Sequence, residues 1–279
     1  MATELGRLFG SKRAKKAILE KEKNAVKLPG AGEDGSPELD KAASATLDVI
    51  GEAGATMATR DEMQATVDAT KPVPKANVDA EDIHDVYDPA ELIGADTLNS
   101  VPFKDWKEGV ESGEGVNVTS RWVATRVDEV ARGPNSISRL RLLRYTYYLI
   151  AFYASSSRKG HRRQAPRKKD FRDLTGASGQ VAMQIQDKFT DRGEINSYHD
   201  ALLLTHIFAF ASIIENFEFD IQFLREDLRI DQEKFGQHFH EIGGRVVSAK
   251  ERGSGKVVQV AKLALPLRFP KQRRMRMRR

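Results

Sequence analysis

Five consecutive segments near the carboxyl end of this 279-residue chain decide its fold. SYHDALLLTHIFAFASIIE (residues 197–215) is apolar enough for a buried helix, and DIQFLREDL (220–228) has the spacing of a short amphipathic helix. DQEKFGQHFHEI (231–242) predicts a third helix that ends at two glycines. GRVVSAK (244–250) and KVVQVAKLAL (256–265) predict two strands joined by the turn ERGSG. Three helices followed by a hairpin is the order of a winged helix, a module that commonly contacts nucleic acid.

A second pattern of the same kind precedes this one. Residues 136–153 predict a long helix, and the basic run RKGHRRQAPRKK at 158–169 is interpreted as a loop. A short helix over 169–174 and a helix over 178–191, capped by Ser178, would complete the three helices. Only residues 193–196 remain for a wing. The sequence therefore predicts tandem winged helices, the first with a degenerate wing.

The entry to the first unit also carries helix signals. Asp88 followed by Pro89 predicts an N-cap and first helical residue, with one helix continuing to Leu98. Trp106 and Trp122 lie on two further short helical runs and are expected to pack into a first core.

The first 83 residues differ from the rest because Phe9 is their one aromatic residue. So little large apolar surface cannot offset the entropy of folding a separate core. We expect a mainly α protein with small β-hairpin wings, in which a tandem winged helix follows an extended, partly helical arm. The expected parts are the arm (1–83), a first winged helix with an N-terminal helical extension (84–196), a second winged helix (197–270) and a basic tail (271–279).

Charge is segregated along the chain although the net charge is only +5. Residues 1–29 carry a net charge of +5, residues 30–100 carry −12 and residues 101–279 carry +12. A basic folded half attracts polyanions at long range. The composition thus favours a nucleic-acid partner for the carboxyl-terminal part.

Several classes of protein and site are not indicated. The chain has no cysteine, so disulfides and thiolate metal sites are excluded. The longest apolar stretch, 201–214, is shorter than a membrane span, and the N-terminus lacks the apolar core of a signal peptide. We expect an intracellular protein without a membrane partner.

Segments that resemble catalytic or metal-binding motifs lack the residues or the geometry that such sites need. GSGK at 253–256 lies between two strands and lacks the first glycine and the Ser/Thr of a phosphate-binding loop. His238 and His240 project from opposite sides of one helix, while His206 lies on an apolar helix and is expected to be a core or boundary histidine. The adjacent carboxylates of residues 226–227 are interpreted as surface charge. We therefore expect no catalytic residue, no metal and no cofactor.

At this point the motifs resemble a known family. LREDLRIDQEKFGQHFHEIGGRV (224–246), VAKLALPLRFP (260–270) and the basic tail resemble the end of the TFIIE/TFIIF-related subunit of RNA polymerase I, the larger partner of a heterodimer within that enzyme. VYDPAELIGADTL (86–98) is similar to the entry of the family's tandem winged-helix domain, and LFGSKRAKKAI (8–18) to the start of its linker.

The resemblance implies a nuclear and nucleolar DNA-binding subunit that supports initiation and elongation of ribosomal RNA synthesis. It also implies that the linker anchors to the RNA polymerase I core through its apolar residues, which are Leu5, Leu8, Phe9, Ile18 and Leu19. Family members pair with the smaller heterodimer subunit through an N-terminal β-barrel. This sequence begins where that barrel would end, either because its beginning is missing or because the barrel has been lost, and pairing with the smaller subunit is therefore doubtful.

Candidate contacts to duplex DNA are basic or amide residues on the expected loop, helices and wing. Lysines and arginines of the wing would neutralise phosphates, whereas the outer face of the last helix, with one lysine and one glutamate, is unsuited to base reading. The candidates are Arg158, Lys159, Arg162, Arg163, Lys168, Lys188, Arg192, Lys234, Gln237, His238, Arg245, Lys250, Arg252 and Lys256. With Lys188 and Arg192, we expect Gln180 and Gln184 to face outward from the helix over 178–191.

Two other functions fit the same pattern. A free-standing DNA-binding regulator would need a base-reading third helix. A winged helix used for protein contact would need an exposed apolar patch, and Tyr145, Tyr148 and Phe152 could supply one unless they form core shared with the second unit. We expect the shared core.

Overall fold

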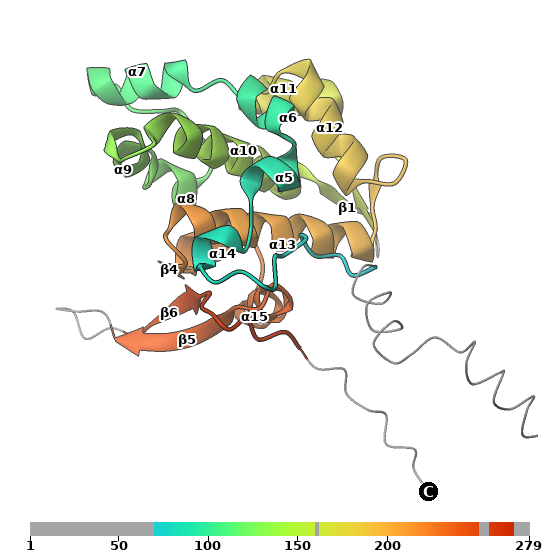
Figure 1. The fold of residues 1–279 in the computed structure, drawn as a ribbon. Helices are drawn as coiled ribbons and strands as arrows, with labels where there is room; N and C mark the ends of the chain where they lie inside the picture. The colour runs from blue at the N-terminus through green and yellow to red at the C-terminus, as the bar shows by residue number, and fades with distance from the viewer. Residues whose placement is uncertain (1–69, 160–161, 251–256, 271–279) are drawn as a thin grey trace, which may run out of the picture. The chain divides into compact units, whose positions relative to one another are not determined.

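The computed structural model describes residues 70–159, 162–250 and 257–270, which fold as helices with two small antiparallel sheets (Figure 1). This is the mainly α fold with small hairpins that the sequence predicts. The expected arm up to residue 69, the wing residues Arg252 and Lys256, and the tail 271–279 lie outside the described residues. The linker residues expected to anchor to polymerase lie outside them too.

Short helices form the N-terminal part of the described fold. Asp88 accepts a hydrogen bond from the Ala90 amide at 2.8 Å, and Pro89 follows it, which confirms the predicted cap. The predicted single helix is wrong, because Gly94 at φ +93° ends one helix and starts another. The elements here are η1 (Ile83–Asp85), α5 (Pro89–Ile93), α6 (Ala95–Ser100), α7 (Lys104–Ser112), α8 (Arg121–Ala124) and α9 (Val127–Arg132).

The next part contains a three-stranded sheet as well as three helices. The basic run predicted as a loop instead forms a hairpin, β1–β2, whose second strand pairs with β3 after α12. The first residues of α11 also belong to that run. The elements are α10 (Ser136–Ser155), β1 (Ser157–Lys159), β2 (Arg162–Gln164), α11 (Lys168–Thr175), α12 (Gly179–Phe189) and β3 (Glu194–Ile195).

The last part follows the order predicted for the second winged helix, with one strand that the sequence did not predict. Strand β4 pairs with β6, so the sheet order is β4-β6-β5. β4 begins directly after Asn216 and Phe217, whose positive φ values of 52° and 68° turn the chain out of α13. The elements are α13 (Ser197–Ile214), β4 (Glu218–Asp220), α14 (Gln222–Leu228), α15 (Gln232–Glu241), β5 (Arg245–Lys250) and β6 (Val257–Lys262).

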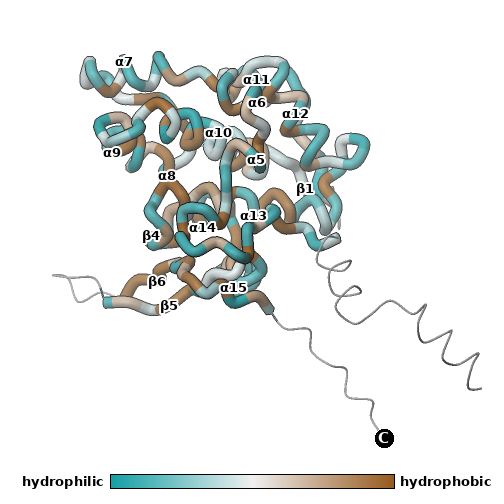
Figure 2. Tube along the Cα trace, viewed as in Figure 1, coloured by the Kyte–Doolittle hydropathy of each residue, from teal (hydrophilic) through white to brown (hydrophobic). Residues whose placement is uncertain are grey.

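One continuous hydrophobic core lies around α10 and α13, which pack side by side (Figures 1 and 2). Tyr145 of α10 contacts Phe210 of α13 edge to face, with ring centroids 5.9 Å apart. Tyr148 and Phe152 are buried as well, so these aromatic residues form shared core rather than an exposed patch. α13 is long and apolar enough to cross a membrane by length and composition, but it is mostly buried within this core.

Hydrogen bonds between buried and half-buried polar groups link the N-terminal helices to the last part of the fold. Asp227 of α14 accepts hydrogen bonds from the Ser120 hydroxyl at 2.6 Å and from the Trp122 amide at 2.9 Å, at the start of α8. The prediction that Asp227 is simple surface charge is therefore wrong. The Tyr87 hydroxyl donates to the Ile242 carbonyl at 2.9 Å, and burial raises the pKa of this tyrosine above its ordinary value.

Candidate nucleic-acid interface

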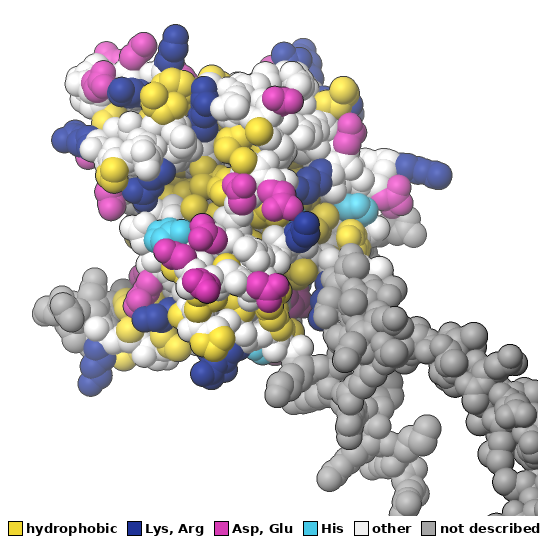
Figure 3. All heavy atoms as spheres, in the orientation of Figure 1, with side chains coloured by type: hydrophobic (Ala, Val, Ile, Leu, Met, Phe, Trp, Pro, Cys, Tyr) yellow, Lys and Arg dark blue, Asp and Glu magenta, His cyan; other side chains and the backbone are white. Residues whose placement is uncertain are grey.

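Two groups of exposed basic residues in the described fold lie near the segments expected to contact DNA. One group is at the start of α11, where Lys168 and Lys169 are exposed, and the other is on the β5–β6 hairpin, where Arg245 and Lys250 are exposed. On the face seen in Figure 3, Asp and Glu side chains gather around α5 and α14 with a few Lys or Arg side chains beside them, and other Lys and Arg side chains lie towards the edges. Phosphate contacts are therefore expected at the edges of this face.

α15 occupies the position of the third helix in the last part of the fold. Its N-cap is Asp231, which accepts from the Lys234 amide at 2.7 Å. Phe235, Phe239 and Ile242 are fully buried, which confirms the predicted inward stripe. Phe235 also packs on Phe208 of α13, with ring centroids 4.2 Å apart.

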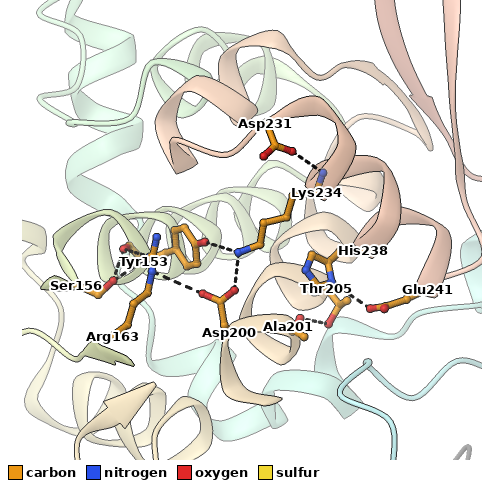
Figure 4. A network of polar contacts seen from close by, with 10 residues as sticks. All are labelled: Tyr153, Ser156, Arg163, Asp200, Ala201, Thr205, Asp231, Lys234, His238 and Glu241. Atoms are coloured by element: carbon orange, nitrogen blue, oxygen red, sulfur yellow. Dashed lines mark hydrogen bonds and ion pairs between the residues drawn. The ribbon is translucent and has the colours of Figure 1, made fainter. Parts of the chain in front are cut away.

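Lys234, a candidate DNA contact, lies in an internal polar network (Figure 4). Its ammonium donates to Asp200 Oδ2 at 2.7 Å and to the Tyr153 hydroxyl at 3.4 Å. The side chain of Lys234 is 28% exposed and that of Asp200 is 18% exposed. The charge of this lysine is thus neutralised within the fold, by an aspartate in the first turn of α13.

Arg163, another candidate, contacts the same aspartate from strand β2 (Figure 4). Its Nε lies 3.7 Å from Asp200 Oδ1, and its Nη1 donates to the Tyr153 carbonyl at 3.1 Å and to the Ser156 hydroxyl at 3.0 Å. The guanidinium also lies 3.9 Å from the centre of the Tyr153 ring. Asp200 therefore joins α15 to β2, and Arg163 is committed to that junction.

The remaining candidates on α15 differ in exposure. His238 contacts Glu241 at 3.0 Å between Nδ1 and Oε2, and its side chain is only 14% exposed. Gln237 is exposed, and its amide donates to Glu233 at 3.3 Å. Of the three candidates on this helix, Gln237 alone is exposed.

α12, the third helix of the preceding part, has its outer face covered. Gln184 Nε2 donates to the Ile93 carbonyl at 3.1 Å, and Lys188 Nζ donates to the Leu92 carbonyl at 2.6 Å. Burial lowers the pKa of Lys188 below its ordinary value. The prediction that Gln184 and Lys188 face solvent is wrong, because the end of α5 packs there. Gln180 is exposed, as predicted.

The other candidates lie on the hairpin and the turns. Arg158 and Lys159 are in β1, where their backbones pair with those of Arg163 and Arg162 in β2. Arg192 is exposed in the turn before β3 at φ 50°. Arg172, one turn along α11 from Lys168, is exposed too. It was not predicted as a DNA contact, because a single arginine in a helix of mixed charge is not a distinctive pattern.

No metal site is evident among residues 70–159, 162–250 and 257–270, where no three His, Asp or Glu side chains are grouped to hold an ion. His206 is a core histidine as expected, enclosed by Phe189 and Phe210. Desolvation, helped by the nearby Lys188 charge, lowers the pKa of His206 to about 3. This histidine therefore stays neutral in the folded protein.

The arrangement defines a class of protein: a mainly helical fold in which the β5–β6 hairpin and the start of α11 carry exposed basic residues, while the helices form one core. A family model described as A49-like RNA polymerase I associated factor matches residues 1–270, so the chain belongs to that family, as its motifs indicated.

Two curated relatives match almost the whole chain. "DNA-directed RNA polymerase I subunit rpa49" of Schizosaccharomyces pombe is 24% identical over 288 residues, which cover 98% of this chain and 66% of the relative. "DNA-directed RNA polymerase I subunit RPA49" of Saccharomyces cerevisiae is 23% identical over 296 residues, covering 97% of this chain and 68% of the relative. The chain thus spans about two thirds of the length of these relatives.

Proposed function

We propose that this protein is a non-catalytic subunit of RNA polymerase I that holds duplex DNA without reading its sequence, through phosphate contacts from its β5–β6 hairpin and from the start of α11. Two observations support the proposal. Its relatives are named as subunits of a DNA-directed RNA polymerase. The exposed basic residues lie on β5–β6 and at the start of α11, next to the β1–β2 hairpin.

The side-chain contacts of α12 and α15, the third helices of the two successive parts, support DNA binding that does not depend on base sequence. Base edges are usually read by Arg, Asn or Gln in bidentate contacts from a helix in the major groove. On α12 the amide of Gln184 and the ammonium of Lys188 are bonded to backbone carbonyls, and on α15 the ammonium of Lys234 is bonded to Asp200. The exposed hairpin charges carry the proposal, since phosphate contacts position a protein on DNA without specifying sequence.

The cellular setting follows from the same assignment. A polymerase I subunit would act in the nucleus and nucleolus and would support initiation and elongation of ribosomal RNA synthesis. The polymerase core would be its protein partner, with the apolar linker residues between Leu5 and Leu19 as the expected anchor.

Fluorescence anisotropy of the full chain with unrelated duplexes across a salt series tests the DNA-binding part. If ~4–6 phosphates are neutralised, the log-log slope of affinity against salt should be roughly −4 to −5, equal for all sequences. Replacing Arg245 and Lys250 by alanine should lower affinity and reduce the slope by about 2. The matched control replaces Lys104 and Arg132, which are exposed on α7 and α9, with the same loss of charge.

Each outcome has a clear meaning. Equal losses in the hairpin variant and the control would show that only net charge matters and would reject the hairpin assignment. A strong preference for one duplex would favour a sequence-reading regulator. No binding at low salt would favour a winged-helix protein used for protein contact.

A further inference from the structure

Lys234 of α15 is held by one carboxylate, whereas Lys188 of α12 is covered by another element. The ammonium of Lys188 donates to the Leu92 carbonyl at the end of α5, which packs there. The ammonium of Lys234 instead donates to Asp200 Oδ2 at 2.7 Å and, over a longer distance of 3.4 Å, to the Tyr153 hydroxyl. The Lys234 side chain is also 28% exposed. Its flexible four-carbon stem can therefore carry the ammonium away from Asp200 by side-chain rotation.

Asp200 keeps a second partner if Lys234 moves away, because Arg163 contacts the other oxygen of the same carboxylate (Figure 4). Arg163 Nε lies 3.7 Å from Asp200 Oδ1, and the arginine side chain is only 13% exposed. Its guanidinium is fixed further by the Tyr153 carbonyl and the Ser156 hydroxyl. A buried carboxylate is costly when it loses every partner, and here one arginine stays in place. Arg163 is thus the permanent partner of Asp200, and Lys234 is the exchangeable one.

The place of Lys234 in α15 suits a phosphate contact. It lies in the first turn of this third helix and is the one Lys or Arg side chain in Gln232–Glu241. In helix-turn-helix modules the N-terminal residues of the third helix face the DNA. A hydrogen bond from an ammonium to a phosphate is of the same charge-assisted kind as one to a carboxylate. Exchanging Asp200 for a phosphate therefore replaces one strong contact by another.

From this arrangement we propose that Asp200 restrains DNA binding by holding Lys234 within the fold, and that a phosphate of bound duplex takes over the ammonium while Arg163 keeps the carboxylate. The inference rests on the proposed duplex binding and adds its regulation by one residue. Asp200 acts through Lys234 and does not touch DNA, so it is a positioning residue. Lys188 cannot respond in the same way, because α5 would have to move first.

Salt-dependent titrations with duplex DNA test the exchange. The full chain and its variants are titrated by fluorescence anisotropy with a duplex of about 20 base pairs, roughly two helical turns. Lys234→Gln should weaken binding about threefold and reduce the log-log salt slope by about 1, because one phosphate contact is lost. Asp200→Asn should strengthen binding about fivefold and leave the slope unchanged, since the ammonium no longer leaves a carboxylate.

A matched control separates this restraint from simple repulsion between Asp200 and DNA. Asp187→Asn removes an exposed carboxylate of α12 and so loses the same charge. In the Lys234→Gln background, Asp200→Asn should strengthen binding no more than Asp187→Asn does. A merely structural role of Asp200 predicts weaker or unchanged binding in both backgrounds. Circular dichroism confirms that each variant is folded.

Acylation of lysine amines measures the hold on Lys234 without DNA. The full chain is treated briefly with acetic anhydride, and the modified lysines are quantified by peptide mass spectrometry. Lys234 should react more slowly than the exposed Lys168 in the unaltered protein. Asp200→Asn should raise the rate at Lys234 towards that of Lys168, and an unchanged rate would contradict the restraint.

Three binding results have separate meanings. An unchanged salt slope for Lys234→Gln would overturn the inference, because the ammonium would then stay inside the fold when DNA binds. Equal gains from Asp200→Asn with and without Lys234 would overturn it as well, since the carboxylate would act by repulsion alone. Absence of duplex binding by the unaltered protein is a different result, which rejects the proposed function and the inference with it.

Discussion

Helices α12 and α15 hold the same position in two successive parts of the fold, yet their outward lysines are used in different ways. Lys188 of α12 donates to a backbone carbonyl of α5, whereas Lys234 of α15 pairs with Asp200 of α13. In both helices, residues that the periodicity places away from the local core are bonded to another part of the chain. A cation on the outer face of a helix is therefore available to DNA only if no other element covers that face.

The largest expected effect concerns the junction at α15. Asp200→Ala would leave Lys234 and Arg163 without their shared carboxylate in a largely buried setting. We expect the free energy of unfolding to fall by about 3 kcal/mol, because unpairing a buried charge is costly. Urea denaturation measures the loss. Asp187→Ala, at an exposed position of α12, should change stability by less than about 0.5 kcal/mol.

Asp200→Asn separates charge from hydrogen bonding at the same position. The amide oxygen can still accept from Lys234, so this variant should retain part of the stability that alanine loses. A loss below about 1 kcal/mol for the alanine variant would contradict the network as the link between α15 and β2.

His206 lies where α13 meets α12, and it should make stability depend on acid pH. Its pKa is about 3 in the folded protein and 6.5 in the reference state, so only the unfolded chain takes up a proton between these values. The stabilising contribution is complete above pH 6.5 and is lost as the pH falls towards 3. The slope approaches about 1.4 kcal/mol per pH unit, which gives a loss of about 2 kcal/mol between pH 7 and 5.

The His206→Gln variant tests this pH dependence, since glutamine does not titrate and can still donate to the Leu202 carbonyl. Urea midpoints measured from pH 7 to 5 should fall less steeply for the variant than for the unaltered protein. Parallel curves would show that other groups cause the acid sensitivity.

Local patterns account for the parts of the fold that the sequence predicted. The caps at Asp88 and Ser178 and the buried stripe of Phe235 and Phe239 depend on residues within a few positions of each other. Capping and helical period are set by backbone geometry over that short range. The same local signals predicted α13 and α15 to within about one or two residues.

Contacts between distant residues explain the errors. Lys188 and Leu92 are 96 positions apart, so no local pattern indicates that α5 covers α12. The β1–β2 hairpin lies within a run of basic residues, and the ladder to β3 crosses two intervening helices. β4 has only three residues and follows a turn with two positive φ values at non-glycine residues. The sequence alone therefore could not show which lysines and arginines are exposed and which are bonded to other parts of the fold.

The caps of the two third helices should differ modestly in strength. Ser178 accepts from the Val181 amide at 3.3 Å, whereas the Asp231 carboxylate accepts from the Lys234 amide at 2.7 Å. Alanine should cost about 1 kcal/mol at either position, and more at Asp231, because a carboxylate also interacts with the helix dipole. Thermal denaturation compares them. Ser178→Gly should lose only a few tenths of a kcal/mol, and an equal loss for alanine and glycine would reject the cap as the cause.

The smallest expected effect is the sharpest test of the comparison between the helices. Lys188→Met keeps the aliphatic length of the side chain and removes a charge that burial disfavours. Because this ammonium is bonded to the Leu92 carbonyl rather than exposed, we expect duplex affinity to change by less than about twofold and the salt slope to stay the same. Lys168→Met, exposed at the start of α11, should instead reduce the slope by about 1. Anisotropy titrations across salt measure both variants. If Lys188→Met reduced the slope as much as Lys168→Met, the covered face of α12 would have to open when DNA binds, and α5 would then be a movable cover rather than a fixed part of the fold.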